Sequence, residues 1–364
     1  MTLDRRSILG AAGAMGAATF SSTAPSIAEG KTVWRMVTTW PRNAPGVGVN
    51  AQRFADRVGA MSAGRLTIEL SAAGELIPAF EALDAVQQGT ADLSHSAPFF
   101  WLGKSQALNY FGSIPLGLLD SEIAAWLEFG GGMALWEETM VDFGIKPLFA
   151  GSSGISAGGW YRKEINDLED LKGLKLRMAG LGGDVMKRLG ATPVLTPPSE
   201  VFQAMSSGAV DAAELIGPWN DMAFGLFDVA DYYYLPGFHE VGPTAEILIN
   251  QSVWDALTDD LKAIVRTAAK ATAIDYNADY RYHNATLLPS LVEQHDVELR
   301  AFPNAVNEAI GRTAMEVLNE LGDSDALTRK IHQSYMTFLR ATNDYAQRFD
   351  TPILNMRAKA LAMF

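Results

Sequence analysis

The fold is decided by a short stretch near the middle of the chain, Leu174-Lys175-Leu176-Arg177-Met178-Ala179-Gly180-Leu181-Gly182-Gly183 (residues 174–183). Leucines alternate with basic residues over 174–177, which predicts a β-strand. The glycine-rich run that follows ends the strand, and residues 184–189 predict a helix. Because residues 192–195 then predict another strand, the stretch begins a strand–helix–strand unit, which is typical of a parallel sheet.

The same rhythm occurs earlier in the chain. Strands predicted at residues 31–39, 66–70 and 91–95 alternate with helices predicted at 49–61 and 79–88. The series that contains the quoted stretch begins near residue 145. A single hydrophobic core stops growing near ~250–300 residues. We therefore expect the 364-residue chain to form two α/β lobes.

The C-terminal third is predicted to be mostly helical. Apolar residues recur at helical spacing over 251–294, with an early break at 257–259. A helix of that length could span both lobes. A short strand at 297–301 and helices at 306–321 and 326–364 complete the prediction.

Arg177 is the residue of greatest functional interest in the quoted stretch. A guanidinium presents its donors in a planar fork that matches a carboxylate with two parallel hydrogen bonds. The glycines that follow let backbone approach whatever the arginine holds. The alternative is an ordinary surface ion pair.

The amino terminus has the features of an export signal over residues 1–28. Arg5 and Arg6 form a basic start, residues 8–20 are apolar and uncharged, and Ser26-Ile27-Ala28 offers a cleavage site. The Arg-Arg-Ser-Ile-Leu run is similar to a twin-arginine signal. We predict a periplasmic protein; the alternative, a buried N-terminal helix, is disfavoured by the glycines in the apolar run.

Composition and missing motifs exclude several functions. The net charge of −13 argues against nucleic acid and anionic membranes as partners. The chain has no cysteine, so it has neither disulfides nor a thiol nucleophile. No HExxH, GxGxxG or Walker sequence is present, and we expect no nucleophile elbow of the GxSxG type. The remaining chemistry is that of binding, and we expect no enzyme.

Candidate binding residues follow predicted strands. The aromatic-rich segment 95–101 follows one of them, and inter-lobe packing is the alternative role for Phe99 and Trp101. Glu214 lies in an apolar stretch, where a buried carboxylate must be paired, protonated or bound to a metal; its alternative role is an ion pair with Arg177 or a lysine. Two carboxylates, Glu214 and Glu240, together with carbonyl oxygens would suit Na⁺ or Ca²⁺.

Several segments resemble the DctP-type periplasmic receptors of tripartite ATP-independent periplasmic (TRAP) transporters. They are Ala73-Gly74-Glu75-Leu76, Ala85 to Asp92, Leu168 to Arg177 and Gly208 to Glu214. The chain is most similar to the branch that binds 2-oxo and 2-hydroxy monocarboxylates, through Trp34 to Pro41, His95-Ser96-Ala97, Gly217 to Asp221 and Tyr232 to Pro243.

The resemblance implies an α/β, two-lobed periplasmic binding protein fold in which crossing strands and a long helix join the lobes. Lobe I would contain residues 29–150 and 240–282. Lobe II would contain 151–239 and 283–364, including the C-terminal helices. The lobes would close over a small carboxylate and deliver it to the membrane permease subunits of the transporter.

The resemblance also assigns roles to residues. Arg177 would form a salt bridge with the ligand carboxylate, and a loop of the other lobe would contact the ligand. The full set of predicted ligand contacts is His95, Ser96, Ala97, Phe100, Ser156, Arg177, Glu214 and Glu240. The branch places a cation, Na⁺ or Ca²⁺, at positions that correspond to Glu214, the Leu215 carbonyl and Glu240.

Three departures from the branch affect the pocket. Ser156 stands where glutamine is usual, and Leu215 where tryptophan is usual. Phe99 and Phe100 stand where tyrosines are common. Each change makes the pocket larger or more apolar. We therefore expect a bulkier, aromatic side chain on the monocarboxylate, while the loss of glutamine at Ser156 puts the cation in doubt.

Three alternatives stay open at this point. The first is a secreted α/β enzyme that uses Glu214 and Glu240 as acid and base. The second is an exported sensor that reports its ligand to a membrane receptor. The third concerns assembly: members of the branch dimerise by exchanging a C-terminal helix, so the chain is either a monomer or a helix-swapped homodimer.

Overall fold

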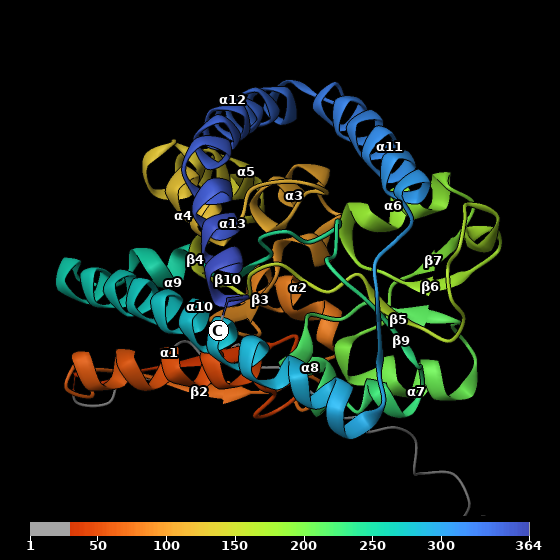
Figure 1. Cartoon of the computed structure of the whole chain (residues 1–364). Helices are drawn as coiled ribbons and strands as arrows, with labels where there is room; N and C mark the ends of the chain where they lie inside the picture. Colours follow the sequence, from red (N-terminus) through yellow and green to blue (C-terminus); the bar gives the residue numbers. More distant parts are fainter. Residues whose placement is uncertain (1–29, 364) are drawn as a thin grey trace, which may run out of the picture.

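Two β-sheets, each covered by helices, form the two lobes of the protein (Figure 1). The computed structural model describes residues 30–363. The predicted export signal at 1–28 lies outside the described residues. The α/β, two-lobed fold is confirmed. Within residues 30–363, no helix combines the length and the apolar character needed to cross a bilayer.

The sheet of lobe I contains five strands. Its order is β2 (Leu66–Ser71), β1 (Thr32–Thr38), β3 (Leu93–Ser96), β10 (Thr244–Asn250) and β4 (Ile145–Ser152). β1 runs parallel to β2 and β3, as predicted, but β10 runs antiparallel to β3 and β4. A wholly parallel sheet was therefore the wrong expectation. The reason is that β10 enters from the other lobe and not through a crossover helix.

The sheet of lobe II contains six strands. Its order is β11 (Glu298–Arg300), β9 (Tyr232–Tyr234), β5 (Gly159–Tyr161), β8 (Ala212–Ala213), β6 (Lys175–Arg177) and β7 (Thr192–Val194). β6 is parallel to β7 and β8, whereas β5 is antiparallel to β8 and β9.

The glycine run after β6 forms the start of a helix. α6 (Gly180–Arg188) begins four residues before the predicted Asp184. Gly180 has φ +60°, a left-handed conformation that favours glycine, and the chain turns there from strand into helix. Arg177 is thereby held at a strand end close to the first turn of α6.

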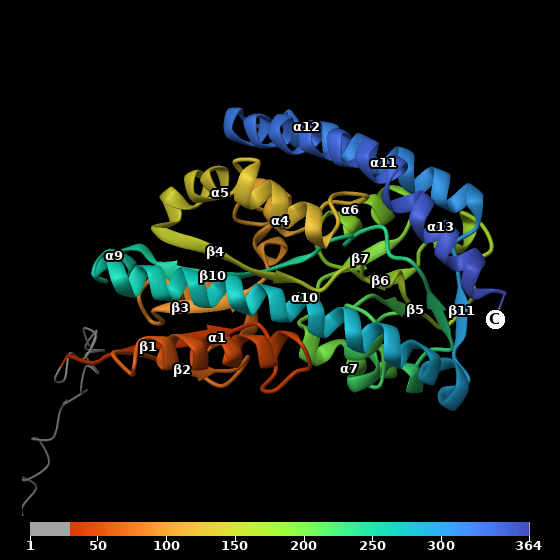
Figure 2. The same ribbon diagram turned by 60° about the vertical axis from the view of Figure 1, so that its left-hand side comes forward.

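The lobes are joined by two crossings and one long helix. The chain passes from β4 to β5 and returns from β9 to β10. α10 (Asp259–His295) lies beside α1 (Val47–Met61) of lobe I (Figure 2) and also contacts α8 (Pro218–Ala223) of lobe II (Figure 1). The predicted spanning helix is therefore present, with its preceding break after α9 (Gln251–Asp255).

The C-terminal helices lie against both lobes. α11 (Asn304–Gly322) packs on α6, whereas α12 (Ala326–Arg348) packs on α3 (Asn109–Gly112), α4 (Asp120–Phe129) and α5 (Gly132–Met140) (Figure 1). The Tyr335 hydroxyl accepts a hydrogen bond from the Leu118 amide at 2.8 Å. The expected range for lobe II, 283–364, thus includes a helix that lies on lobe I, because the apolar face of α12 is buried there.

The remaining elements are short. The other α-helices are α2 (Ala82–Gln87), α7 (Val201–Ser207) and α13 (Asp350–Leu361). The 3-10 helices are η1 (Ala79–Glu81), η2 (Pro98–Trp101), η3 (Gln106–Leu108), η4 (Val141–Phe143), η5 (Glu169–Leu171), η6 (Pro198–Glu200) and η7 (Leu226–Asp228).

Candidate functional site

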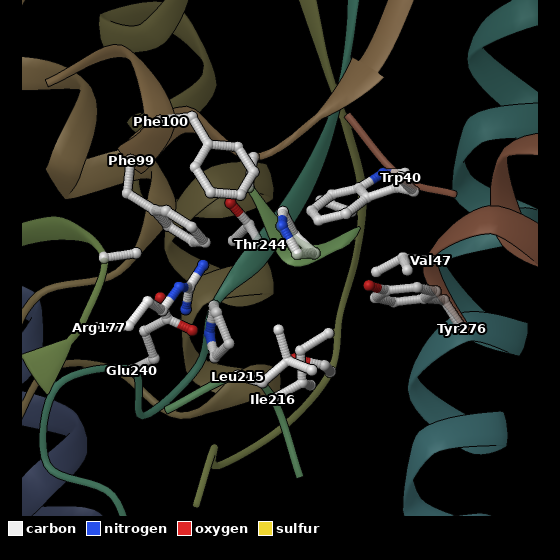
Figure 3. Close-up of a pocket in the computed structure, with 16 residues that line it drawn as sticks. Trp40, Val47, Phe99, Phe100, Arg177, Leu215, Ile216, Glu240, Thr244 and Tyr276 are labelled. Carbon is white, nitrogen blue, oxygen red and sulfur yellow. The ribbon is translucent and has the colours of Figure 1, made fainter. Parts of the chain in front are cut away.

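A narrow pocket with a cavity volume of about 30 Å³ lies between the lobes, where β1, η2, β6 and α10 approach one another (Figure 3). Most of the lining is apolar, and its ionisable side chains include Arg177 and Glu240. The lining residues are Trp40, Val47, Ala97, Phe99, Phe100, Ser153, Arg177, Ala179, Pro198, Leu215, Ile216, Glu240, Pro243, Thr244, Ala245 and Tyr276.

Arg177 is buried at the end of β6 and points into the pocket (Figure 3). Its Nη1 donates to the Glu214 carbonyl oxygen at 2.8 Å and to Glu214 Oε1 at 2.6 Å. Its Nε donates to the Thr196 carbonyl at 3.2 Å. Nη2 makes no hydrogen bond to any residue within 30–363. The guanidinium is therefore fixed on one side and keeps donors for a ligand on the other.

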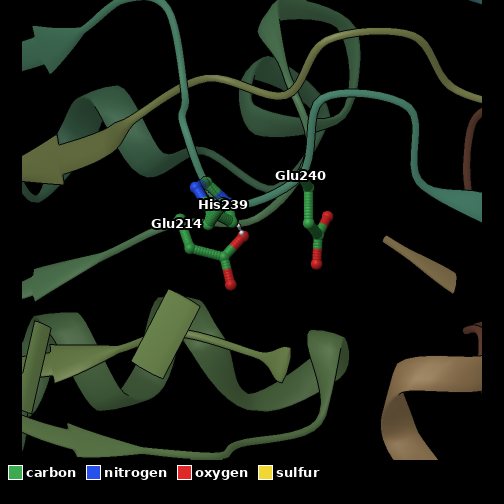
Figure 4. A group of neighbouring side chains, drawn as sticks. All are labelled: Glu214, His239 and Glu240. Atoms are coloured by element: carbon green, nitrogen blue, oxygen red, sulfur yellow. Dashed lines mark hydrogen bonds and ion pairs between the residues drawn. The ribbon is translucent and has the colours of Figure 1, made fainter. Parts of the chain in front are cut away.

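Glu214, His239 and Glu240 form a buried cluster beside Arg177 (Figure 4). One ligand atom from each lies within 4.8 Å of the others. His239 Nε2 is 3.1 Å from Glu214 Oε2, and the Ala179 amide donates to Glu214 Oε1 at 2.8 Å. Glu214 is thus the partner of Arg177, which is the ion pair that the sequence left open.

The charges of this cluster are strongly coupled. Burial opposes ionisation of Glu214, but the charges of Arg177 and His239 outweigh it and hold the pKa of Glu214 below its usual value. Burial also disfavours the charged form of His239, yet Glu214 raises the pKa of that histidine. For Glu240, burial and the Glu214 charge act together and raise its pKa to about 8. One carboxyl is therefore ionised and its neighbour holds a proton at neutral pH.

The donor set suits a hard cation. Carboxyl oxygens of Glu214 and Glu240 converge, as Na⁺ and Ca²⁺ require, and a cation bound there would displace the proton of Glu240. Leu215 is in the pocket lining, and its carbonyl oxygen accepts no hydrogen bond from a described residue. His239 Nδ1 is buried without a partner among residues 30–363. These residues fit the cation that the resemblance places here, and no geometric conflict excludes it.

His239 was not predicted as a site residue from the sequence. It lies beside Glu240 in the chain, but its contact with Glu214 crosses 25 positions. Adjacency to a buried carboxylate was the only local signal. The other lining residues without an earlier prediction include Trp40 at the end of β1 and Tyr276 on α10.

The predicted loop 95–97 divides its residues between the pocket and the core. Ala97 lines the pocket, as does Phe100 on η2. His95 lies behind this wall, where its Nδ1 accepts from Trp40 Nε1 at 2.9 Å, and burial lowers its pKa to about 3. Ser96 is buried as well and donates to Glu246 at 2.7 Å. Both side chains thus support residues of the wall.

Ser156 also lies outside the lining. Its hydroxyl donates to Glu240 Oε2 at 3.3 Å, and its amide donates to the Glu240 carbonyl at 2.9 Å. A glutamine here would reach further towards the pocket than serine does. The structure therefore places Ser156 as a support for Glu240, while Leu215 takes a place in the wall itself.

The chain matches known proteins along most of its length. Residues 36–325 match the DctP model, described as bacterial extracellular solute-binding protein, family 7. A monocarboxylate 2-oxoacid-binding periplasmic protein of Nostoc sp. PCC 7120 is 37% identical over 305 residues, which cover 84% of this chain and 83% of the relative.

Two solved structures are similar in fold and sequence. One is a TRAP periplasmic solute binding protein of Pseudoalteromonas atlantica with bound sodium and pyruvate, at TM-score 0.87 and 36% identity, covering 89% of this chain and 99% of that chain. The other is a TRAP solute binding protein of Bordetella bronchiseptica with copurified calcium and picolinate, at TM-score 0.89 and 30% identity, covering 92% and 99%. With its two lobes, inter-lobe pocket and family match, this chain belongs to the DctP family of bacterial extracellular solute-binding proteins.

Proposed function

We propose that this protein is the periplasmic receptor of a TRAP transporter and binds a monocarboxylate, a 2-oxo acid or a related compound. The observation that carries the proposal is Arg177, a buried guanidinium whose Nη2 bonds to none of the described residues and faces an inter-lobe pocket. A desolvated guanidinium fork is suited to a carboxylate. The names of the similar proteins, which refer to 2-oxoacids, pyruvate and picolinate, agree with this ligand class.

The rest of the pocket favours an acid with a bulky, aromatic side chain. Trp40, Phe99, Phe100 and Tyr276 contribute rings to the lining, and Leu215 leaves more room than a tryptophan would. Aromatic pairs add to burial when ring centroids lie ~4.5–7 Å apart. The relative with picolinate shows that a related pocket accepts an aromatic acid.

A cation is part of the proposal. Na⁺ or Ca²⁺ would be held by Glu214, Glu240 and the Leu215 carbonyl, and it would supply positive charge for the oxygens of the ligand. The chain's own residues orient the acid: Arg177 fixes the carboxylate, and the aromatic wall excludes water. Both similar structures contain a bound cation together with an acid.

Transport follows from lobe closure. The pocket is lined by residues of both lobes. A ligand can therefore contact lobe I and lobe II at the same time only when the lobes are close together. Glu214 is engaged by Arg177 and His239, an arrangement suited to holding charge and not to moving a proton between substrate atoms. We therefore propose a receptor that leaves its ligand unchanged, is exported by the twin-arginine signal at 1–28, and passes the acid to membrane permease subunits.

Calorimetry with defined probes tests this function. Pyruvate, phenylpyruvate and picolinate would be titrated into the protein with NaCl, with CaCl₂, and after chelation by EDTA. We expect phenylpyruvate or picolinate to bind more tightly than pyruvate, with cation dependence, and to be recovered unchanged by mass spectrometry. Tight binding of pyruvate with no binding of the aryl acids would refute the preference for a bulky, aromatic side chain, and chemical conversion of the acid would favour the enzyme.

A further inference from the structure

Glu246 is a buried carboxyl that does not line the pocket. It lies on β10 opposite Ser96 of β3 in the sheet register, and its side chain has no solvent exposure. One oxygen, Oε1, accepts from Ser96 Oγ at 2.7 Å and from Trp101 Nε1 at 2.7 Å. Oε2 has no partner among the described residues. Both hydrogen bonds that this carboxyl accepts from described residues therefore come from one short segment, residues 96–101.

The two donors lie at the two ends of the segment that forms the wall of lobe I. Between Ser96 and Trp101 lie Ala97, Phe99 and Phe100, all of which line the pocket. The segment is closely packed from behind, since a Cβ at Gly112 would lie only 2.9 Å from the Phe99 amide nitrogen. Because α3 leaves no free space behind the segment, a small shift at either end would move the rings of Phe99 and Phe100 within the pocket.

The rings of Phe99 and Phe100 contact other aromatic residues of the lining, and Phe99 also lies close to lobe II. The Phe100 ring lies 5.6 Å from the Trp40 ring and 4.9 Å from the Phe99 ring, measured between centroids. Phe99 lies close to lobe II. A Cβ added at Gly180 of α6 would be only 3.4 Å from the Cβ of Phe99. The position of Phe99 thus sets the space between the wall and the first turn of α6, which follows Arg177.

We propose that Glu246 is a positioning residue that sets the pocket's selectivity for the ligand side chain by fixing both ends of the Ser96–Trp101 segment. The inference rests on the proposed function. Arg177 holds the carboxylate from the opposite lobe, so the wall governs what the carboxylate is attached to. Two donors from the two ends of the segment converge on a single oxygen of Glu246, so one side chain holds both ends in place.

The test is the ratio of dissociation constants for phenylpyruvate and pyruvate, measured by calorimetry with Ca²⁺ present. The variants are Glu246→Ala, Ser96→Ala and Trp101→Phe. We expect Glu246→Ala to lower the preference for the aryl acid about tenfold, the scale of a lost pocket contact. The two donor variants should act in the same direction to a smaller extent. Glu246→Gln keeps an acceptor oxygen for both donors, so its ratio should match the parent's.

Ser62→Ala is the matched control for Ser96→Ala. Ser62 is also a buried serine of lobe I, and its hydroxyl donates to the Leu66 carbonyl at 2.9 Å, away from the pocket. It should lower stability without moving the ratio. If Glu246→Ala does not fold, the two donor variants decide. An unchanged ratio in all folded variants overturns the inference, whereas a parent that binds neither acid overturns the proposed function and this inference with it.

Discussion

Arg177 combines a structural and a binding role in one guanidinium. Nη1 and Nε are committed to Glu214 and Thr196, and Nη2 is left for the ligand. The arginine was expected from the sequence as a carboxylate anchor or as a surface pair. Its side chain is in fact paired and only 2% exposed, so the pair is desolvated and its geometry is fixed before a ligand arrives.

Arg177→Ala should weaken monocarboxylate binding by about 2–5 kcal/mol, the range for breaking a buried charge pair. It also leaves Glu214 buried without its main partner, so thermal stability should fall. Calorimetry on the folded fraction separates the two effects. Arg162→Ala is the control, since that arginine of lobe II donates to the Val229 carbonyl outside the pocket. An affinity near the parent's would exclude Arg177 as the anchor.

Leu215→Trp should restore a narrow pocket. Added bulk in a closely packed site costs about 1–3 kcal/mol, and the cost should fall on acids with large side chains while pyruvate fits. Competition binding between phenylpyruvate and pyruvate measures the change. Leu215→Ile conserves volume and should leave the preference unaltered. Equal losses for both acids in the tryptophan variant would show that residue 215 does not face the ligand side chain.

Glu246 should make stability pH-dependent. Burial raises its pKa from 4.5 to about 7, so the folded state holds a proton that the unfolded state releases above pH 4.5. The contribution is fully present below pH 4.5 and is lost as pH rises towards 7, by about 3 kcal/mol at 1.36 kcal/mol per pKa unit. Glu246→Gln removes this loss. Its denaturation midpoint should gain on the parent's between pH 5 and 7.5; parallel pH profiles would contradict the shift.

At the scale of elements, most helices and strands follow from local pattern. Periodicity predicted β6, β7 and the break between α9 and α10 because each depends on neighbouring residues. The strand β10 and the start of α6 at Gly180 were not predicted. Both depend on where a distant segment lies, since β10 pairs with β3 and β4 from far along the chain.

Helix α8 of lobe II makes a direct hydrogen bond to lobe I. Asn220 on α8 is buried, and its Nδ2 donates to the Pro45 carbonyl of lobe I at 2.8 Å. The bond exists only while the lobes are close. Asn220→Ala should therefore destabilise the closed form by about 0.5–1.5 kcal/mol and speed ligand release in stopped-flow measurements by up to about tenfold.

Asn307→Ala is the control for this inter-lobe bond. Asn307 makes a similar bond, to the Phe302 carbonyl at 2.8 Å, but both residues follow the strands of lobe II. Its release rate should equal the parent's. Identical rates in the Asn220 and Asn307 variants would show that the Asn220–Pro45 bond does not oppose opening.

At the scale of the whole molecule, α13 stands apart from both lobes. It contacts α12, and none of its described residues is buried. Exposed apolar side chains on it include Ile353, Leu354, Met356 and Leu361. Several exposed apolar side chains on one helix are typical of an interaction site. A second copy of the chain is the partner that the helix-swapped dimer requires, and we therefore predict a homodimer.

Removal of residues 349–364 should convert the dimer into a monomer that still binds its ligand, because the pocket contains no residue of this segment. Light scattering after size-exclusion chromatography measures the mass. Ile353→Ser with Leu354→Ser should weaken the dimer without shortening the chain. A full-length protein that stays monomeric at tens of micromolar would contradict the prediction.

The two α/β lobes, the spanning helix and the family could be predicted before the fold was known, because periodicity and motifs are local properties of the chain. The sequence also singled out Arg177, Glu214 and Glu240, whose roles at the ligand stay predictions. Which groups are in contact is known only from the fold. His239 contacts Glu214, His95 accepts a hydrogen bond from Trp40, and α12 packs on lobe I. These contacts join residues far apart in sequence, and the packing of two lobes fixes them where no local pattern can.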